Sequence, residues 1–398
     1  MSQQTDILVS GGGVAGLIAT AAFASAGFTT ICVDPTPPVT SEGAAGADMR
    51  STAFLQPSRI VLERAGLWER LAPFAAPLKV MRIIDAGGAE PVARLSRDFN
   101  AGELSDAPFG WNFPNWLLRR EMVARLADLP LADFRPGVAV SGLVTRLTGA
   151  EVTLSDGSRI HARLVVAADG RDSFVRRAVG IPVRTTRYGQ KALAFAVTHP
   201  IPHDNVSTEI HRSGGPFTFV PLPDREGVPS SAVVWMERGA EAERLAALPV
   251  PEFEAAMTER STGLLGPLRL ATRRALWPMI TQIAGRFSAE RTALIAEAAH
   301  VIPPIGAQGL NMSLADLRCL LDLCEKDPVH LGEPAMLDAY HRRRWPEVKA
   351  REIGIDLLNR ASMVGAPPLR DLRAGVLGVL YGMAPVRRAL MRAGLGMR

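Results

Sequence analysis

The chain has 398 residues, of which 47% are hydrophobic and 21% charged, a balance that excludes disordered and fibrous classes and indicates a globular protein. Its net charge of +5 comes from 45 basic and 40 acidic residues, and no basic run alternates with aromatic residues, so we predict no nucleic-acid partner. Cys32, Cys319 and Cys324 form no CxxC or Cys/His spacing, which argues against a metal site and favours a reducing, cytoplasmic location.

Residues 7–33 carry no charge, and hydropathy alone would assign them to a membrane span or a signal peptide. Neither assignment fits, because no Lys or Arg precedes the stretch and its centre, SGGGVAGLIATAAFASAG, is rich in Gly and Ser. We therefore predict a buried parallel strand over residues 6–10, followed by a glycine turn and a helix of small residues.

A GxGxxG motif formed by Gly11, Gly13 and Gly16 follows this strand directly. Gly11 permits the tight turn, Gly13 lets the backbone approach a pyrophosphate, and Gly16 lets the helix pack closely on the strand. Val14 and Ala15 stand where the helix start would offer unpaired N–H groups to phosphates. The placement of the motif between a strand and a helix predicts a dinucleotide site.

Asp34 ends the next predicted strand, over residues 29–33, about 20 residues after the glycines, where a carboxylate can accept hydrogen bonds from ribose hydroxyls. FAD and NAD both fit these features. The alternative is a glycine-rich turn that binds no ligand, and the carboxylate at this spacing argues against it.

Two later segments also place a turn and a helix after a buried strand. The strand that begins near Ala162 runs into Asp169 and Gly170, and Ser173 stands near the cap of the following helix. The strand after Arg291 runs into an acidic residue, a Pro/Gly loop and a helix. Glycine lets such a loop lay its backbone against a flat ring, and a helix start aims N–H groups at an electron-rich ring edge. The candidate residues of this last segment are Glu297, Pro304, Gly306, Gly309, Leu310 and Asn311.

Together these motifs resemble the group A flavoprotein monooxygenases of the para-hydroxybenzoate hydroxylase fold, and most closely the ubiquinone-biosynthesis hydroxylases of the UbiH and UbiF type. The resemblance spans nearly the whole chain and includes residues 48–54 and the Arg-rich tail. It implies that FAD is the cofactor, that Arg50 and Arg119 lie along the flavin, and that Asp169 touches the cofactor and the nicotinamide path. One position departs from the family, which usually has Gly-Asp where this chain has Ala296 and Glu297.

In the family that Asp hydrogen-bonds the ribitol of FAD. The longer Glu297 can make the same contact only if the loop backs away or the side chain folds. We still expect FAD to bind, because the pyrophosphate and ribose contacts do not depend on this carboxylate.

The activity that the resemblance implies is hydroxylation of an aromatic ring, in which NAD(P)H supplies electrons and O2 supplies the oxygen atom. The implied substrate is a polyprenyl phenol intermediate of ubiquinone biosynthesis. The chain has no second GxGxxG, which fits enzymes that meet NAD(P)H only transiently at the flavin. No catalytic side chain can be assigned, and we interpret His300 as a residue that hydrogen-bonds backbone beside the flavin loop. Two alternatives stay open, a hydroxylase of soluble phenols and a weakly active flavoprotein scaffold.

The predicted fold class is α/β, with a Rossmann-like FAD-binding domain interleaved with an antiparallel-sheet substrate domain and followed by C-terminal helices. Strands are predicted over residues 192–198, 215–222 and 230–236, helical structure over 238–260, and an irregular loop over 35–47. The FAD-binding domain would comprise residues 1–77, 112–185 and 281–345, the substrate domain 78–111 and 186–280, and the C-terminal helical segment 346–398.

The tail over residues 369–398 contains six arginines and a single acidic residue, with apolar residues between them. A basic amphipathic helix of this kind can lie on an anionic bilayer, and it can equally pack against a domain or another copy. The resemblance to quinone hydroxylases favours peripheral contact with the inner membrane. A homo-oligomer and a complex of ubiquinone-biosynthesis proteins are further partners left open.

Overall fold

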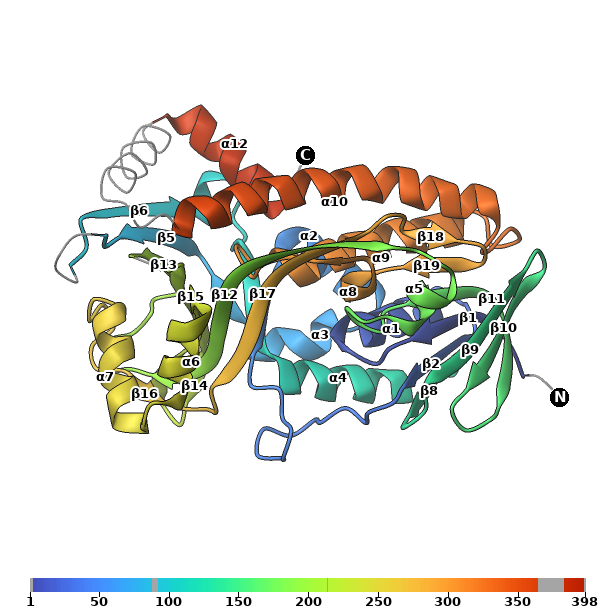
Figure 1. Cartoon of the computed structure of the whole chain (residues 1–398), viewed down its shortest axis with the longest axis horizontal. Coiled ribbons are helices and arrows are strands. Elements are labelled where there is room, and N and C mark those ends of the chain that lie inside the picture. Colours follow the sequence, from blue (N-terminus) through green and yellow to red (C-terminus); the bar gives the residue numbers. More distant parts are fainter. Residues whose placement is uncertain (1–2, 88–91, 213, 364–382, 397–398) are drawn as a thin grey trace.

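A computed structural model describes residues 3–87, 92–212, 214–363 and 383–396. Three sheets and the helices around them make up these residues, and the protein is of the mixed α/β class. Figure 1 shows one large sheet toward each end of the molecule, and a long helix, α10 (Pro334–Met363), that runs past both. The predicted segment 369–398 lies partly outside the described residues, because only residues 383–396 of it are described.

The first sheet holds the predicted strand–turn–helix segments. Its central strands are parallel, in the order β19, β11, β1, β2, β8, with an antiparallel hairpin beside β11. The predicted strands over residues 6–10 and 29–33 are confirmed within β1 and, one residue later, β2. The bounds are β1 Gln3–Ser10, β2 Thr30–Asp34, β8 Ala132–Pro136, β9 Val140–Arg146, β10 Gly149–Leu154, β11 Arg159–Ala167, β18 Ser288–Ala289 and β19 Thr292–Leu294.

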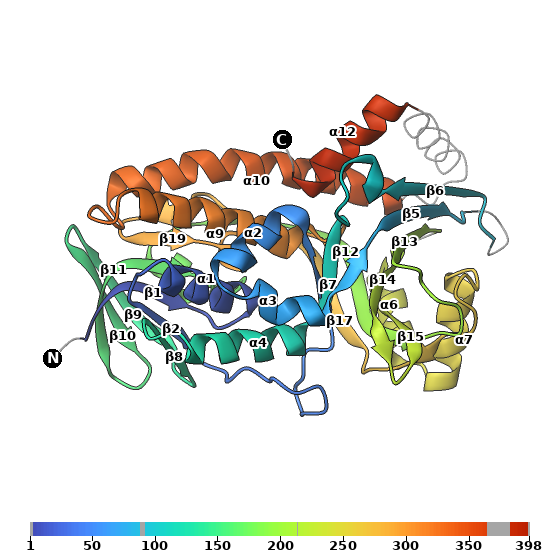
Figure 2. The same ribbon diagram turned by 180° about the vertical axis from the view of Figure 1, so that it is seen from behind.

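Helices cover this sheet and build the largest core. Figure 2 shows α1 and α4 packed against it, with α2 and α3 beside them. The apolar strand residues Ile7, Leu8 and Val9 are fully buried against Leu17 and Ile18 of α1, as expected for parallel strands covered on both faces. The bounds are α1 Val14–Ser25, α2 Gln56–Arg64, α3 Trp68–Leu71, α4 Asn115–Ala127, α5 Phe174–Ala178, α8 Ala296–Ala299 and α9 Gln308–Lys326.

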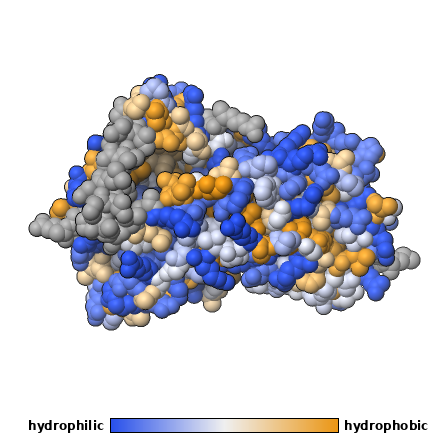
Figure 3. All heavy atoms as spheres, turned by 45° about the horizontal axis from the view of Figure 1, so that its top comes forward, coloured by the Kyte–Doolittle hydropathy of each residue, from blue (hydrophilic) through white to orange (hydrophobic). Residues whose placement is uncertain are grey.

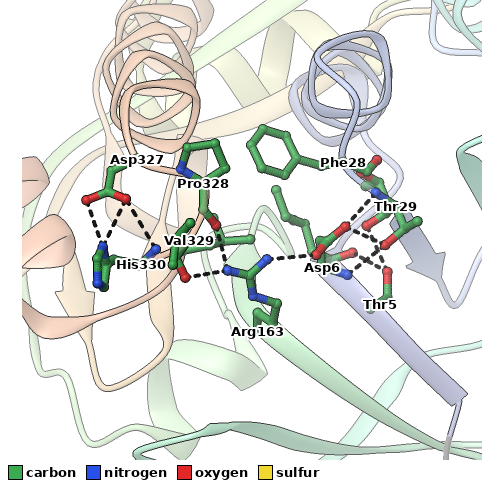
Figure 4. Close-up of polar contacts among 12 residues, drawn as sticks. Thr5, Asp6, Phe28, Thr29, Arg163, Asp327, Pro328, Val329 and His330 are labelled. Atoms are coloured by element: carbon green, nitrogen blue, oxygen red, sulfur yellow. Dashed lines mark hydrogen bonds and ion pairs between the residues drawn. The ribbon is translucent and has the colours of Figure 1, made fainter.

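Arg163, in the middle of β11, connects this sheet to the segment that follows α9 (Figure 4). Its guanidinium donates to Asp6 Oδ1 at 3.0 Å and to the carbonyls of Pro328 and Val329 at 2.6 and 2.7 Å. Asp6 in turn accepts from the backbone N–H and the hydroxyl of Thr29. The Arg163 side chain therefore joins β11 and β1 to the connection between α9 and α10, and Asp6 extends the network to Thr29, just before β2.

The second sheet is mainly antiparallel, in the order β20, β17, β12, β15, β14, β13, β5, β6. The three strands predicted for this sheet are confirmed in β12, β14 and β15, which pair antiparallel as expected. β5 and β13, for which no strand was predicted, pair in parallel. The bounds are β5 Val80–Asp85, β6 Leu95–Asn100, β12 Val183–Thr198, β13 Val206–His211, β14 Pro216–Arg225, β15 Val228–Arg238, β16 Arg269–Leu270, β17 Ala275–Ala284 and β20 His300–Val301.

The two faces of this sheet differ. One face buries Phe195, Phe217 and Trp235 under two helices, α6 (Gly239–Ala247) and α7 (Val250–Arg260). The helical stretch predicted over 238–260 is therefore two helices, because Pro249 interrupts it. The opposite face carries smaller apolar residues, and Ile305, in the loop before α9, packs against part of it.

A small third sheet lies between the two large ones, with β7 (Gly110–Pro114) paired to β3 (Ser51–Leu55) and β4 (Ala76–Leu78). Two 3-10 turns, Ala72–Phe74 and Ala101–Glu103, complete the connections. No helix or strand is formed over the predicted loop 35–47.

The long helix α10 contacts both large sheets. The Tyr340 hydroxyl donates to Leu294 O at the end of β19, and Asp356 accepts from the Tyr188 hydroxyl of β12. The last described helix, α12 (Ala384–Leu395), packs Met391 and Leu395 against the body of the protein. The described part of the tail is thus a packed helix, one of the readings that the sequence left open.

Candidate active site

The three predicted cofactor segments meet at one edge of the first sheet. The glycine turn follows β1, Asp169 follows β11 and Glu297 follows β19, and these three strands are parallel neighbours. The carboxyl ends of adjacent parallel strands are where ligands bind in open α/β sheets. The sequence prediction that these segments act together is consistent with this geometry.

The three glycines of the turn are glycine for different structural reasons. A Cβ added at Gly11 would lie 2.3 Å from Ala168 O, and one added at Gly16 would lie 1.8 Å from Gly11 O. A Cβ at Gly13 would meet no atom within 4 Å. Gly13 is also the N-cap of α1, where no side chain caps the helix and no acidic residue stands in the first turn. Its N-terminus, with Val14 and Ala15, therefore faces open space with unpaired N–H groups, a favourable place for an anion.

Asp34 braces the glycine turn. Its Oδ2 accepts from the Gly12 N–H at 2.6 Å and its Oδ1 from the Thr36 N–H at 2.8 Å. The carboxylate therefore stands beside the turn, as its spacing predicts. A contact with ribose would use the lone pairs that these two bonds leave free.

Asp169 stands beside the same turn and has one unused oxygen. Its Oδ2 accepts from the Val175 N–H at 3.1 Å, whereas Oδ1 is buried with no hydrogen-bond partner in the part of the chain that the structure describes. Ser173 caps α5 by accepting from the Arg176 N–H at 2.9 Å, so the predicted cap is confirmed. A buried carboxylate oxygen without a donor is costly, and a ligand hydroxyl at this place would satisfy it.

Glu297 lies on α8, after Ala296 in the left-handed region at φ 54°. Its side chain is 51% exposed, and Oε2 lies 3.7 Å from Nε of Arg171, two residues after Asp169. The segments that contain Asp169 and Glu297 are therefore adjacent. The exposed carboxylate is free to turn toward a ligand at this edge.

Arg50 and Arg119 share one carboxylate that sequence reasoning left without a role. Arg50 donates to both oxygens of Asp48, at 2.8 and 2.7 Å, and Arg119 lies 3.4 Å from Asp48 Oδ2. Burial alone would raise the pKa of Asp48, but the hydrogen bond and charge of Arg50 hold that pKa below its usual value. The Arg50 guanidinium also lies 4.6 Å from the ring centroid of Trp277 on β17. Arg50 thus connects the segment before β3 to the second sheet.

The loop before α9 turns sharply through Gly306 and Ala307, at φ 63° and 55°. Pro304 is exposed at its start, and Leu310 is partly buried against the main core. A Cβ at Gly309 would meet nothing within 4 Å, and the N-terminus of α9 has no side-chain cap and no acidic residue in its first turn. The N–H groups there are free to face an electron-rich group.

The Asn311 side chain is committed to protein partners. Its Oδ1 accepts from the Leu55 N–H and the Ser58 hydroxyl, and its Nδ2 donates to the carbonyls of Ala53 and Ala307. These bonds fill its capacity. Any contact of Asn311 with a cofactor would therefore come from its backbone.

The partner predicted for His300 is wrong. Its Nε2 lies 2.6 Å from Asp316 Oδ2 on α9, and no side chain at this pair is exposed. Arg344 of α10 approaches the other carboxylate oxygen, with Nε 2.8 Å from Oδ1. The histidine therefore joins a buried ionic cluster instead of bonding backbone, and it is part of the packing behind the loop.

The wall opposite the loop is apolar. Ala192, Met236 and Met279 of the second sheet are buried there, and Ile305 of the loop packs against them. Nearby Tyr188 has its pKa raised to about 12 by burial and by Asp356, so its phenol keeps its proton near neutral pH. The described residues contain no group of three or more side chains that could hold a metal ion.

Comparison with known proteins decides the family. The model of the FAD binding domain family matches residues 4–352. The chain belongs to this family of FAD-binding proteins. The ubiquinone hydroxylase UbiL of Rhodospirillum rubrum is 32% identical over 394 residues, covering 98% of this chain and 89% of the relative. The 3-demethoxyubiquinol 3-hydroxylase of Escherichia coli is 24% identical and covered in full, as is this chain.

Solved structures agree on the fold of this FAD-binding protein. The p-nitrophenol 4-monooxygenase PnpA of Pseudomonas putida superposes with a TM-score of 0.80 at 19% identity, over the full length of both chains. The residues present also fit FAD. Open space at Gly13 suits a pyrophosphate, and the unpartnered Asp169 oxygen suits a ribityl or ribose hydroxyl.

Proposed function

We propose that this FAD-binding protein is an NAD(P)H- and O2-using aromatic-ring hydroxylase that acts on a polyprenyl phenol intermediate of ubiquinone biosynthesis. The observation that carries the proposal is the full-length similarity to two ubiquinone-pathway hydroxylases. FAD, when bound, supplies the chemistry that moves one oxygen atom from O2 to the ring. The chain's own residues bind and orient the cofactor and exclude water.

The proposed cofactor residues divide by task. The helix start at Gly13, Val14 and Ala15 binds the pyrophosphate, and Asp34 orients the adenosine ribose. Asp169 and Glu297 bind hydroxyls of the chain that links the ring system to the phosphates. Arg50 and Arg119, held by Asp48, supply positive charge along the flavin.

The remaining proposed residues, Pro304, Gly306, Gly309, Leu310 and the backbone of Asn311, form the surface against the flavin ring. In this arrangement the free N–H groups of α9 favour negative charge at the ring edge. We further propose that the predicted domain division holds, with the first sheet carrying FAD and the second carrying the substrate.

The apolar wall supports a dry reaction chamber. Ala192, Met236, Met279 and Ile305 offer no hydrogen bonds to water, so a phenol held between the wall and the flavin would be shielded from solvent. No described residue on this wall is poised to take the phenol proton, and we assign no catalytic base.

Turnover by the purified protein tests the proposal. The protein should copurify with flavin, and a prenylated phenol should stimulate its NADH or NADPH oxidation with formation of a hydroxylated product. Cells lacking the protein should accumulate the unhydroxylated quinone precursor. Stimulation by soluble phenols alone would contradict the polyprenyl substrate, and flavin without any product would favour the scaffold alternative.

We also propose that the protein docks on an anionic membrane surface through α10 and α12. Leu357 and Leu358 of α10 are 62% and 61% exposed, and Ile353, Met383 and Leu390 are about half exposed. Figure 3 brings this face forward, with apolar side chains among hydrophilic ones. None of the described helices is long and apolar enough to cross a bilayer.

Charge on this face favours lipid over another protein. Arg388 and Arg392 of α12 are exposed and make no ion pair within the described residues. Each such arginine near an anionic surface contributes about 1 kcal/mol, which salt weakens. The mixture of aliphatic and basic side chains is typical of helices that lie in the interface.

Vesicle sedimentation tests this docking. Leu357→Asp with Leu358→Asp should abolish binding to anionic vesicles, whereas Leu147→Asp with Val329→Asp, at still more exposed positions outside α10 and α12, should not. Unchanged sedimentation of the first variant would overturn the proposal. A changed oligomeric state without a change in sedimentation would assign the face to a homo-oligomer or a biosynthetic complex.

A further inference from the structure

Gln308, the first residue of α9, connects three separate parts of the chain. Its Nε2 donates to Gly306 O at 2.9 Å and to Gly394 O of α12 at 2.8 Å, and its Oε1 accepts from Arg351 Nη1 of α10 at 2.9 Å. The side chain is only 9% exposed. One amide therefore bridges the loop before α9, the long helix and the last described helix.

The loop that Gln308 contacts is held in an unusual conformation. Ala307 has φ 55° and ψ 28°, in the left-handed region that residues with a Cβ rarely adopt. Two side chains hold the carbonyls at this turn, Gln308 on Gly306 and Asn311 on Ala307, the latter at 2.6 Å. Loss of the Gln308 bond would leave the strained turn with one of these two restraints.

Docking of α12 supplies the partner for the Gln308 amide. Gly394 lies in the last turn of α12, where backbone carbonyls have no partner within the helix. Met391 and Leu395 of the same helix are buried against Leu55 and Phe109. The carbonyl of Gly394 therefore reaches Gln308 only while this apolar face of α12 is seated.

We propose that Gln308 is a positioning residue through which the docking of α12 sets the conformation of the loop 303–309. Because α12 also belongs to the proposed lipid-docking face, the loop is sensitive to events at the surface of the protein. The inference rests on the proposed function only where it places this loop against FAD. The contacts that carry it are protein contacts.

A double-mutant cycle in the full-length protein tests the connection. Gln308→Leu removes the bridge, and Met391→Asp unseats α12 by placing a charge in its buried contact. Hydrogen exchange of the amides of residues 305–311, measured without FAD or lipid, should become faster in each variant. The double variant should exchange no faster than either single one, because both changes remove the same restraint.

FAD affinity gives the second measurement. Each single variant should raise the dissociation constant of FAD about tenfold, as expected for one lost hydrogen bond, and the double variant should also be about tenfold weaker and not a hundredfold. Gln308→Glu, which keeps an acceptor for Arg351 but has no donor for Gly394, should behave like Gln308→Leu. The matched control Ala389→Asp adds the same charge at an exposed position of α12 and should leave both measurements unchanged.

The outcomes separate this inference from the proposed function. Additive effects in the cycle, wild-type exchange in either single variant, or wild-type behaviour of Gln308→Glu would overturn the role of Gln308. Coupled exchange with unchanged FAD affinity would support the link from α12 to the loop and remove the loop from the flavin site. Neither measurement uses an aromatic substrate, so failure of the hydroxylase proposal would not affect them.

Discussion

Gly13 differs from its two neighbours in the glycine motif, because it alone faces open space. Gly13→Val would therefore leave packing intact but place two methyl groups where the pyrophosphate approaches the backbone. We expect loss of FAD retention with little change in the free energy of unfolding. Flavin absorbance of the purified protein, compared with Gly43→Val at another open glycine, measures this. Full flavin content in Gly13→Val would show that the turn does not bind the cofactor.

Gly16, unlike Gly13, is required by the fold, because its position has no room for a Cβ atom. A methyl group there would lie 1.8 Å from Gly11 O, so helix and turn must separate. We expect Gly16→Ala to lower the free energy of unfolding by about 1–3 kcal/mol, as in other overpacked sites. Urea unfolding checks the value, with Gly13→Ala as the control that should unfold like the wild type.

Glu297 carries the one departure from the family motif. The carboxylate is half exposed and close to Arg171. Because Asp is the residue that the family usually has here, Glu297→Asp should bind FAD equally or more tightly. Glu297→Ala should weaken binding by about 1–3 kcal/mol through the lost hydrogen bond to the cofactor. Titration of the FAD-free protein measures all three affinities. If they are identical, Glu297 does not contact the cofactor.

At the scale of elements, a buried ionic cluster fastens α9, α10 and the segment before the loop. Burial alone would raise the pKa of Asp316, but His300 and Arg344 hold it below its ordinary value of 3.8. Since the folded pKa of Asp316 is lower than its unfolded pKa, the ionised carboxylate contributes its full stabilisation at pH values above the unfolded pKa. The contribution is lost as the pH falls through the folded pKa.

Replacement of this carboxylate gives a test of that cluster. Asp316→Asn removes one of the two carboxylates that pair with the buried Arg344 and leaves Glu347 as the other, so it should cost about 1–3 kcal/mol at neutral pH. It should also flatten the loss of stability as the pH falls below about 4, because that loss begins near the unfolded pKa of the Asp316 carboxyl and is complete below its folded pKa. Urea unfolding across this range measures both effects. Asp338→Asn, at an exposed ion pair with Arg286, should keep the wild-type pH dependence.

The helices and strands that could be predicted from the sequence are those that follow from patterns among neighbouring residues. The strand before Gly11, the cap at Ser173 and the strands over 192–198 and 230–236 follow from short-range patterns and are confirmed. The partner of His300, the parallel pairing of β5 with β13 and the packing of α12 depend on contacts between distant residues. Periodicity carries no information about such contacts.

The same limit applies to the site. The glycines, Asp34, Asp169 and Glu297 could be found because fixed spacing after strands predicts where they gather. Asp48 lies in a segment the resemblance included, but its pairing with Arg50 and Arg119 and the contact of Arg50 with Trp277 need the folded chain. The cofactor roles of these residues stay predictions.

At the scale of the whole molecule, the two large sheets are joined by one continuous helix. The predicted boundary between residues 345 and 346 falls inside α10, which contains Pro346 and continues to Met363. The interleaved domain division itself stays a prediction. The shared helix nevertheless indicates that the two sheets unfold together, because each holds one end of the same rigid element.

The two ends of α10 must keep a fixed rotational orientation relative to each other about the helix axis. Tyr340 hydrogen-bonds to the end of β19, and Asp356 accepts a hydrogen bond from Tyr188 of β12. The number of helical turns between Tyr340 and Asp356 therefore determines which side of α10 faces each sheet. One alanine inserted after Lys349 would rotate everything beyond it by about 100° and advance it by about 1.5 Å. We expect the insertion to break one of these two hydrogen bonds and to lower the temperature of thermal unfolding. An insertion near exposed Asp204, outside any helix or strand, should not do so. Wild-type stability with the inserted alanine would mean that the sheets are not coupled through α10.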